Sequence, residues 1–223
     1  MAPNGRGATP LFNDFDYRDN VVCFTPGILI ETSNGEVPVE CFRPGDILKT
    51  TDNGFQPVRW VGSRSLTSPE LEQRPNLRPI VICKGAFGNR RKMLVAPQHG
   101  NMAKHFGDNR LIRAKHAAEV LGGTFTWLDK KRTSVTYIHI IFNRHQIVVA
   151  ERMETEAFFP GPMALRSICR PALFELLALV PELESVASGK SNPRQRYREP
   201  ARDYILRKDA LLKETRKSAE CLN

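Results

Sequence analysis

The chain has 223 residues, enough for one sizeable folded domain with appendages, and 41% of them are hydrophobic, a share that is ordinary for a globular protein. Its formal net charge of +9 would suit nucleic acid if the basic residues gathered on the folded domain, but many of them lie after residue 189, so we expect no nucleic-acid partner. No apolar run approaches the roughly 20 residues that span a bilayer, and residues 1–20 lack the apolar stretch of a signal peptide. We therefore expect no membrane span, and a cytoplasmic location or secretion by a route without such a peptide.

The first half of the sequence has the pattern of short strands separated by turns. Residues 1–20 are rich in Gly, Pro, Asn and Asp, and we predict that they form a flexible leader. From residue 21 to 161, short β-branched and aromatic runs alternate with turn residues, which indicates a mostly β domain. Asn-Gly pairs at 34–35 and 53–54 predict tight reversals between strands.

The second half changes from strand patterns to helical patterns. The runs SVTYIHIIF and HQIVVAE are separated by Asn143 and Arg144, which we interpret as a hairpin connection. Leucines recur at helical spacing within residues 162–188, which predicts a short amphipathic helical extension. Residues 189–223 form a charged tail, predicted to be a polar linker followed by a solvated helix over 201–219.

Cys23 stands at the start of the ordered region and is the first candidate for chemistry. It opens the stretch CFTPGILIETSNGEVPVECFRPGDILKT, which resembles the first block of Hint (hedgehog/intein) domains: a cysteine after an extended segment, a Gly-containing turn, a G..PVE hairpin and then RPGD. The later string LVAPQH places His99 where these domains carry the histidine of a Thr-x-x-His motif. The resemblance spans roughly residues 22–181 and looks closest to a bacterial branch of the family.

The resemblance implies a fold and an activity. The fold would be a Hint-type β horseshoe with pseudo-two-fold symmetry over residues 21–161, followed by short C-terminal helices. The activity would be self-processing: Cys23 attacks the carbonyl of Val22 and converts the amide into a thioester, and His99 protonates the departing amine. The leader is then the substrate in cis, and water or an external nucleophile resolves the thioester.

Two departures from the family pattern bear on this activity. Ala96 replaces the threonine of Thr-x-x-His, so a hydroxyl that helps to hold the scissile amide is missing and cleavage is expected to be slow. Thr155-Glu156 lies where inteins carry His-Asn, and Asn223 is the last residue, so neither region offers the asparagine that splicing needs. We therefore expect thioester cleavage without full splicing.

Two further histidines are candidates for the same site. His139 and His145 lie on strands that return beside the nucleophile in Hint folds, and either could orient the reacting groups. His139 also fits a satisfied core histidine, because it is in phase with Tyr137 on one strand face. The histidines and cysteines show no zinc-ligand spacing, so we propose no metal, and no motif indicates a cofactor.

A second hypothesis competes with self-cleavage. The chain could be a cleavage-inactive Hint-fold module that serves in binding or in secretion-associated assembly, an alternative favoured by Ala96 and by the 22 residues that precede Cys23. The intact mass of the protein with and without a thiol or hydroxylamine separates the two hypotheses.

Overall fold

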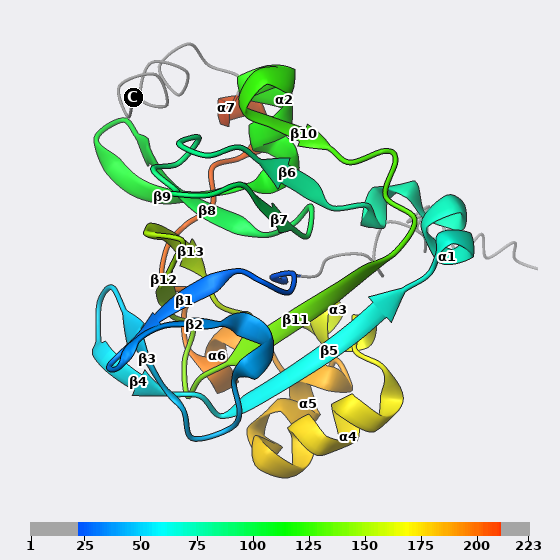
Figure 1. The fold of residues 1–223 in the computed structure, drawn as a ribbon. Coiled ribbons are helices and arrows are strands. Elements are labelled where there is room, and N and C mark those ends of the chain that lie inside the picture. Colours follow the sequence, from blue (N-terminus) through cyan, green and yellow to red (C-terminus); the bar gives the residue numbers. More distant parts are fainter. Residues whose placement is uncertain (1–21, 211–223) are drawn as a thin grey trace, which may run out of the picture.

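The computed structural model describes residues 22–210, and short antiparallel strands make up most of its sheets (Figure 1). One eight-stranded sheet has the order β2-β1-β3-β12-β13-β8-β9, with β4 paired to β3. A three-stranded sheet has the order β10-β6-β7, and β11 pairs with β5. The bounds of the strands are β1 (Leu29–Thr32), β2 (Gly35–Pro38), β3 (Ile47–Thr50), β4 (Gly54–Pro57), β5 (Trp60–Leu66), β6 (Ile80–Ile82), β7 (Met93–Val95), β8 (Gly100–His105), β9 (Asp108–Arg113), β10 (Thr126–Leu128), β11 (Val135–Ile141), β12 (Ile147–Ala150) and β13 (Met153–Glu156).

The tight turns of the first half lie where the Asn-Gly pairs predict them. The pair at 34–35 lies at the reversal between β1 and β2, and the pair at 53–54 lies at the reversal between β3 and β4. The prediction of a hairpin across Asn143 and Arg144 is wrong. β11 pairs along its whole length with β5, whereas β12 pairs with β13, so the chain crosses between sheets here.

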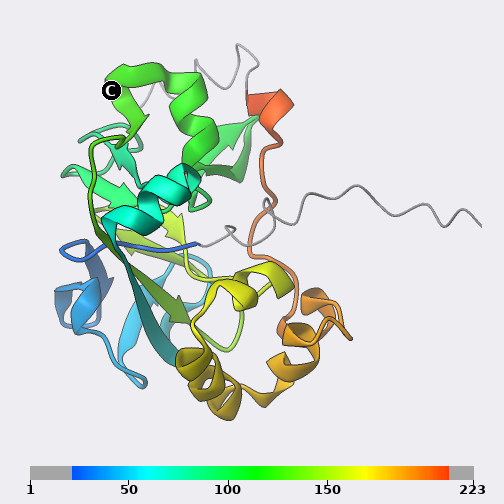
Figure 2. The ribbon, with the colours of Figure 1, turned by 90° about the vertical axis from the view of Figure 1, so that its right-hand side faces the viewer.

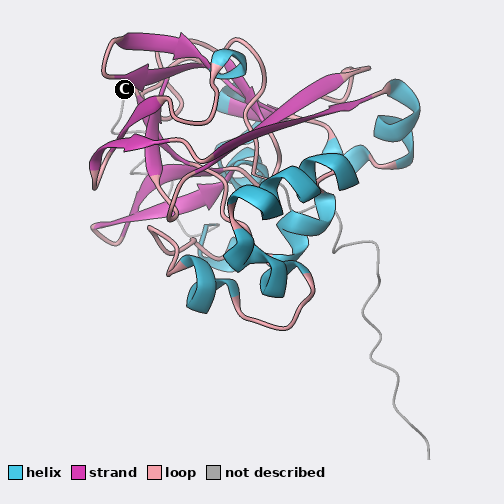
Figure 3. Cartoon of the chain, turned by 90° about the horizontal axis from the view of Figure 1, so that it is seen from below, coloured by secondary structure: helices cyan, strands magenta, loops and turns pink. Residues whose placement is uncertain are grey.

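The helices between residues 162 and 197 gather on one side of the strands, as Figure 3 shows. Two earlier helices interrupt the β region, and the last helix, residues 207–210, packs beside the second of these. α1 begins after Thr67, which forms a reciprocal capping box with Glu70. α2 buries Ala114, Ala117 and Val120 at helical spacing. The helices are α1 (Ser68–Gln73), α2 (Ala114–Phe125), α3 (Pro162–Ser167), α4 (Arg170–Leu179), α5 (Glu184–Ala187), α6 (Pro193–Tyr197) and α7 (Arg207–Ala210), and no helix in residues 22–210 is long and apolar enough to cross a bilayer.

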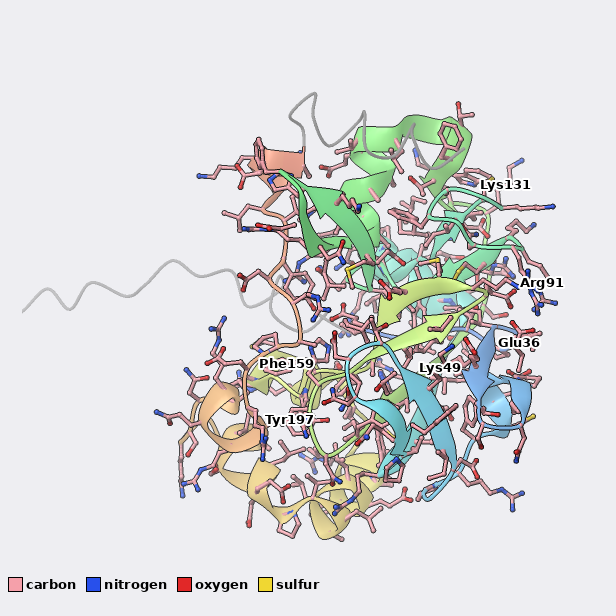
Figure 4. All side chains as sticks on the ribbon, turned by 90° about the vertical axis from the view of Figure 1, so that its left-hand side faces the viewer. Glu36, Lys49, Arg91, Lys131, Phe159 and Tyr197 are labelled. Atoms are coloured by element: carbon pink, nitrogen blue, oxygen red, sulfur yellow. The ribbon has the colours of Figure 1, made fainter. Side chains whose placement is uncertain are left out.

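The part of the tail that the structure describes, residues 189–210 (the C-terminal segment), contains α6 and α7 and is attached to the β domain through buried residues, which a fully solvated tail would not have. Tyr197 is buried, and its hydroxyl donates to the Phe142 carbonyl over 2.6 Å. Figure 4 shows Tyr197 beside Phe159, with ring centroids 6.0 Å apart. Further along, Ile205 donates its backbone N–H to the carbonyl of Leu111 in β9. Residues 211–223 of the predicted tail helix lie outside the described residues.

The first described residues run through the middle of the molecule. Phe24 forms bridges with Val95 of β7 and Ile138 of β11 and therefore joins the three-stranded sheet to the β5–β11 pair. Its backbone exchanges hydrogen bonds of 3.0 and 2.9 Å with Ile138. Because Phe24 is also buried in the main hydrophobic core, the residues just before it are held inside the fold.

Candidate active site

Cys23 lies completely buried between β7 and β11. The bridges made by Phe24 fix the backbone on one side of it, and the Ala96 N–H donates to the Cys23 carbonyl over 3.1 Å on the other. The thiol shares an apolar cluster with Ala96 and Tyr137 among others. The nucleophile predicted from the sequence is therefore held in a fixed and water-poor position.

The closest polar partner of this thiol is His139, on β11. Its Nδ1 lies 3.2 Å from the Cys23 Sγ and 3.3 Å from the Val22 carbonyl oxygen. One ring nitrogen thus contacts both the thiol and the carbonyl that the thiol would attack. Of the four candidates from the sequence, Cys23 and His139 are brought together directly.

Burial sets the protonation of both groups. It lowers the pKa of His139 to about 4, so its ring is neutral at pH 7. Burial also raises the pKa of the Cys23 thiol well above its ordinary value, against a smaller opposing effect of the Arg64 charge. The resting pair is therefore a thiol beside a neutral imidazole, whose Nδ1 can accept the thiol proton in the tautomer that carries its hydrogen on Nε2.

Two aromatic rings fix the plane of the His139 ring. Trp60 stacks on it with a centroid distance of 6.4 Å, and Phe158 meets it edge-on at 4.9 Å. The Trp60 ring in turn covers Gly62, which pairs with His139 across the two strands. A Cβ at Gly62 would lie 1.9 Å from the Trp60 ring, so only glycine leaves room for this arrangement.

His99 is buried next to the same backbone but bonds elsewhere. The Thr155 hydroxyl donates to the Gly100 carbonyl over 2.8 Å, so at 2.7 Å it accepts from Nε2–H of His99. This assigns the proton of the neutral ring to Nε2, and within residues 22–210 the Nδ1 atom of His99 has no hydrogen-bond partner. Burial lowers the pKa of His99 to about 4. Its ring lies edge-on to Phe24, with centroids 4.6 Å apart.

His145 is engaged with the C-terminal segment and not with the thiol. The backbone N–H of Ala201 donates to Nδ1 of His145 over 3.0 Å. Nδ1 therefore acts as the acceptor and Nε2 carries the ring hydrogen, 3.1 Å from the Ala157 carbonyl and 3.3 Å from the Glu156 carboxylate. Nδ1 thus holds the C-terminal segment and Nε2 contacts the end of β13, which differs from the expected role beside Cys23.

A comparison with known protein families identifies the family to which the chain is similar. The family model described as the Hint domain matches residues 22–162, so it begins one residue before the buried thiol. The chain belongs to the Hint domain family. This membership indicates self-processing of the Hint type as the general function. No curated protein matches the chain.

Solved structures of Hint-like domains are similar to this one. The solution structure of a bacterial intein-like domain from Clostridium thermocellum is 13% identical and has a TM-score of 0.40; the match covers 61% of this chain and 99% of that one. A splice-inactive variant of the AceL NrdHF class 3 split intein is 11% identical, with a TM-score of 0.39 and coverage of 61% and 96%.

The Hint domain also contains a buried carboxylate that sequence reasoning missed as a site residue. Glu156 is fully buried, accepts from the Gly100 N–H over 2.5 Å and accepts from the Tyr204 hydroxyl. Burial, together with the Glu156 charge, raises the pKa of Tyr204 well above its ordinary value, so the phenol stays protonated and remains a donor. The neighbouring Thr155 holds His99, so this carboxylate lies one residue from the site.

The signal that could have found this carboxylate was weak. Glu156 stands in the region where inteins carry His-Asn, but only the three-dimensional fold brings Tyr204 to it from the C-terminal segment. In the part of the chain that the structure describes, no group of three or more His, Cys, Asp and Glu side chains is placed to hold a metal ion.

Proposed function

We propose that this Hint domain cleaves its own chain between Val22 and Cys23 by exchange of the amide for a thioester. The observation that supports the proposal most is the position of His139 Nδ1, within 3.3 Å of both the thiol and the scissile carbonyl oxygen. A general base must lie within hydrogen-bonding reach of the proton that it removes, and this nitrogen does.

In the proposed step, His139 carries the proton of the Cys23 thiol. His139 takes the proton of the Cys23 thiol as sulfur attacks the carbonyl carbon of Val22, and the resulting imidazolium donates a hydrogen bond to the carbonyl oxygen, which becomes negative. The carbon–nitrogen bond then breaks as the proton that His139 took from the thiol passes, by way of His99, to the Cys23 nitrogen, which becomes the free amine. Water or an external nucleophile cleaves the thioester and releases the segment ending at Val22, with no splicing.

The role of His99 as the acid needs one change from the sequence-based hypothesis. The neutral ring carries its proton on Nε2 and donates it in a hydrogen bond to the Thr155 hydroxyl oxygen, so Nδ1 must gain a proton before it can donate one. We propose His139 as the first carrier of the thiol proton. His99 is then the second proton site, used as the amine leaves.

The test is the intact mass of the full chain before and after treatment with dithiothreitol or hydroxylamine. We expect release of the segment ending at Val22 and a fragment that begins at Cys23. Cys23→Ala should abolish release, whereas Cys41→Ala is the matched control, because Cys41 is an exposed free thiol. Release from Cys23→Ala, or equal loss from both variants, would refute the proposal.

Matched substitutions test the roles of the two histidines one at a time. His139→Asn places an amide near the Nδ1 position but cannot carry the proton, and we expect release to slow by about 100-fold or more. His99→Gln keeps a donor toward Thr155 and removes only the Nδ1 function. If His99→Gln slows release while the thermal stability is unchanged, His99 is supported as the second proton site. If the release rate is unchanged, His99 has no such role.

A second candidate function is a Hint module that does not cleave, and Ala96 favours it. Ala96 is buried in the cluster around Cys23 and brings no hydroxyl to the scissile amide. If the missing hydroxyl is what limits the rate of cleavage, Ala96→Thr should accelerate release by about 10-fold or more. If neither the natural chain nor Ala96→Thr yields a fragment while both fold, the non-cleaving module is the function.

A further inference from the structure

The residue before the scissile bond is buried in a hydrophobic cluster of its own. Val22 is only 8% exposed, although it is the first residue that the structure describes. It belongs to a cluster that includes Trp60 and Phe158 and then Leu165, Leu176 and other residues of helices α3–α5. The family match ends at residue 162, so most of this cluster lies in the helical extension, beyond the matched region.

The same cluster encloses the ring that contacts the scissile carbonyl. His139 Nδ1 lies 3.3 Å from the Val22 carbonyl oxygen, and the His139 ring is bounded by Trp60 and Phe158. In Figure 2 the first described residues, in blue, lie beside the yellow helix that follows residue 161, which is α3. The side chain of Val22 and its carbonyl are therefore held by one connected set of apolar groups.

We propose that Trp60, Phe158 and helices α3–α5 form a subsite for the acyl residue, the one whose carbonyl Cys23 attacks. The subsite takes an apolar side chain of about the size of valine and presents its carbonyl to His139. The binding itself is independent of cleavage, whereas its consequence for the rate rests on the proposed function. A carbonyl displaced by about 1 Å loses on the order of 100-fold in rate, so the filling of this subsite controls the exchange.

The first arm of the test measures binding without chemistry. In the full chain carrying Cys23→Ala, Val22→Asp places a carboxylate in the apolar cluster and should lower the melting temperature by roughly 5 °C or more. Phe55→Asp is the matched control, because Phe55 is 51% exposed on β4 and outside the cluster. Equal melting temperatures for Val22→Asp and Phe55→Asp would overturn the subsite.

The second arm measures selectivity in the chain that retains Cys23. Val22→Ile should release at nearly the natural rate, Val22→Ala about 10-fold more slowly and Val22→Asp about 100-fold more slowly. Equal rates for all four side chains would overturn the subsite. If no chain releases a fragment but Val22→Asp still melts early, the subsite stands and the proposed function falls.

A double-mutant cycle assigns the effect to the helical extension. Leu165 is fully buried in α3 and belongs to the cluster of Val22. We expect Val22→Ala and Leu165→Ala to be non-additive in melting temperature, because residues that share a packed cluster couple. Strict additivity would remove α3 from the subsite, and Ile168→Ala, at the edge of the same cluster, replaces Leu165→Ala if that chain does not fold.

Discussion

The two buried histidines should make the fold sensitive to mild acid. His99 and His139 each have a pKa of about 4 in the folded chain, because burial opposes their charge, against 6.5 for an ordinary histidine. Between these values the unfolded chain binds more protons than the folded chain does. The stability that the two neutral histidines contribute is therefore fully present above about pH 6.5 and is lost as pH falls toward 4.

The size of the loss follows from the two pKa values. One such histidine costs roughly 2 kcal/mol in the free energy of unfolding between pH 7 and pH 5, and the pair costs roughly 4 kcal/mol. The total free energy of unfolding of a domain is about 5 to 15 kcal/mol, so this loss is a large part of its stability. Below about pH 4 both folded rings also titrate, and this contribution levels off.

The assay is urea unfolding at pH 7, 6 and 5, followed by circular dichroism in the Cys23→Ala chain so that cleavage does not intervene. His139→Asn should remove about half of the pH dependence, and adding His99→Gln should remove most of the rest. Because each variant is compared with itself across pH, its own cost in stability cancels. A stability that is flat from pH 7 to 5, or a slope unchanged by both substitutions, would refute the assignment of neutral buried rings.

Three further perturbations test the packing around the site. Gly62→Ala should lower the melting temperature by roughly 5 °C or more, because the new methyl group collides with Trp60, and an unchanged melting curve would contradict this packing. Tyr204→Phe should cost about 1 to 3 kcal/mol in urea unfolding by removing a donor to the buried Glu156, and a neutral effect would contradict this contribution of the Tyr204 hydroxyl. Ending the chain after Ser188 should abolish cooperative unfolding measured by circular dichroism, whereas a truncated chain as stable as the full one would show that the C-terminal segment is dispensable.

The strands and the position of Cys23 at the start of the folded region were predictable because their signals are local. Turn chemistry at residues 34–35 and 53–54 specifies two hairpins from neighbouring residues alone. Cys23 could be found because its flanking residues carry the family pattern. α1 could also have been found, since Thr67, Pro69 and Glu70 are a helix start signal. In contrast, α2 buries mainly alanines on its inner face, so it lacks the leucine stripe that marks an amphipathic helix.

The roles of the remaining residues depend on contacts between distant parts of the sequence. His139 has the same local pattern as a core strand histidine, and only the meeting of β11 with the first described residues shows that its ring contacts Cys23. Tyr197 and Tyr204 are isolated aromatics among charges, which is typical of a solvated helix. Their partners are the Phe142 carbonyl and the Glu156 carboxylate, both far away in sequence.

The docking of the C-terminal segment also has a consequence for timing during synthesis. Cys23 is translated well before Tyr204, whose hydroxyl donates to the buried Glu156. At about 5 to 20 residues per second, translation separates the two residues by roughly 10 to 40 s. Throughout that interval the carboxylate beside the site lacks this donor, and the nascent domain cannot reach its final packing. The proposed exchange would therefore begin only after Tyr204 has been made, so that its substrate stays attached until the domain behind it has folded.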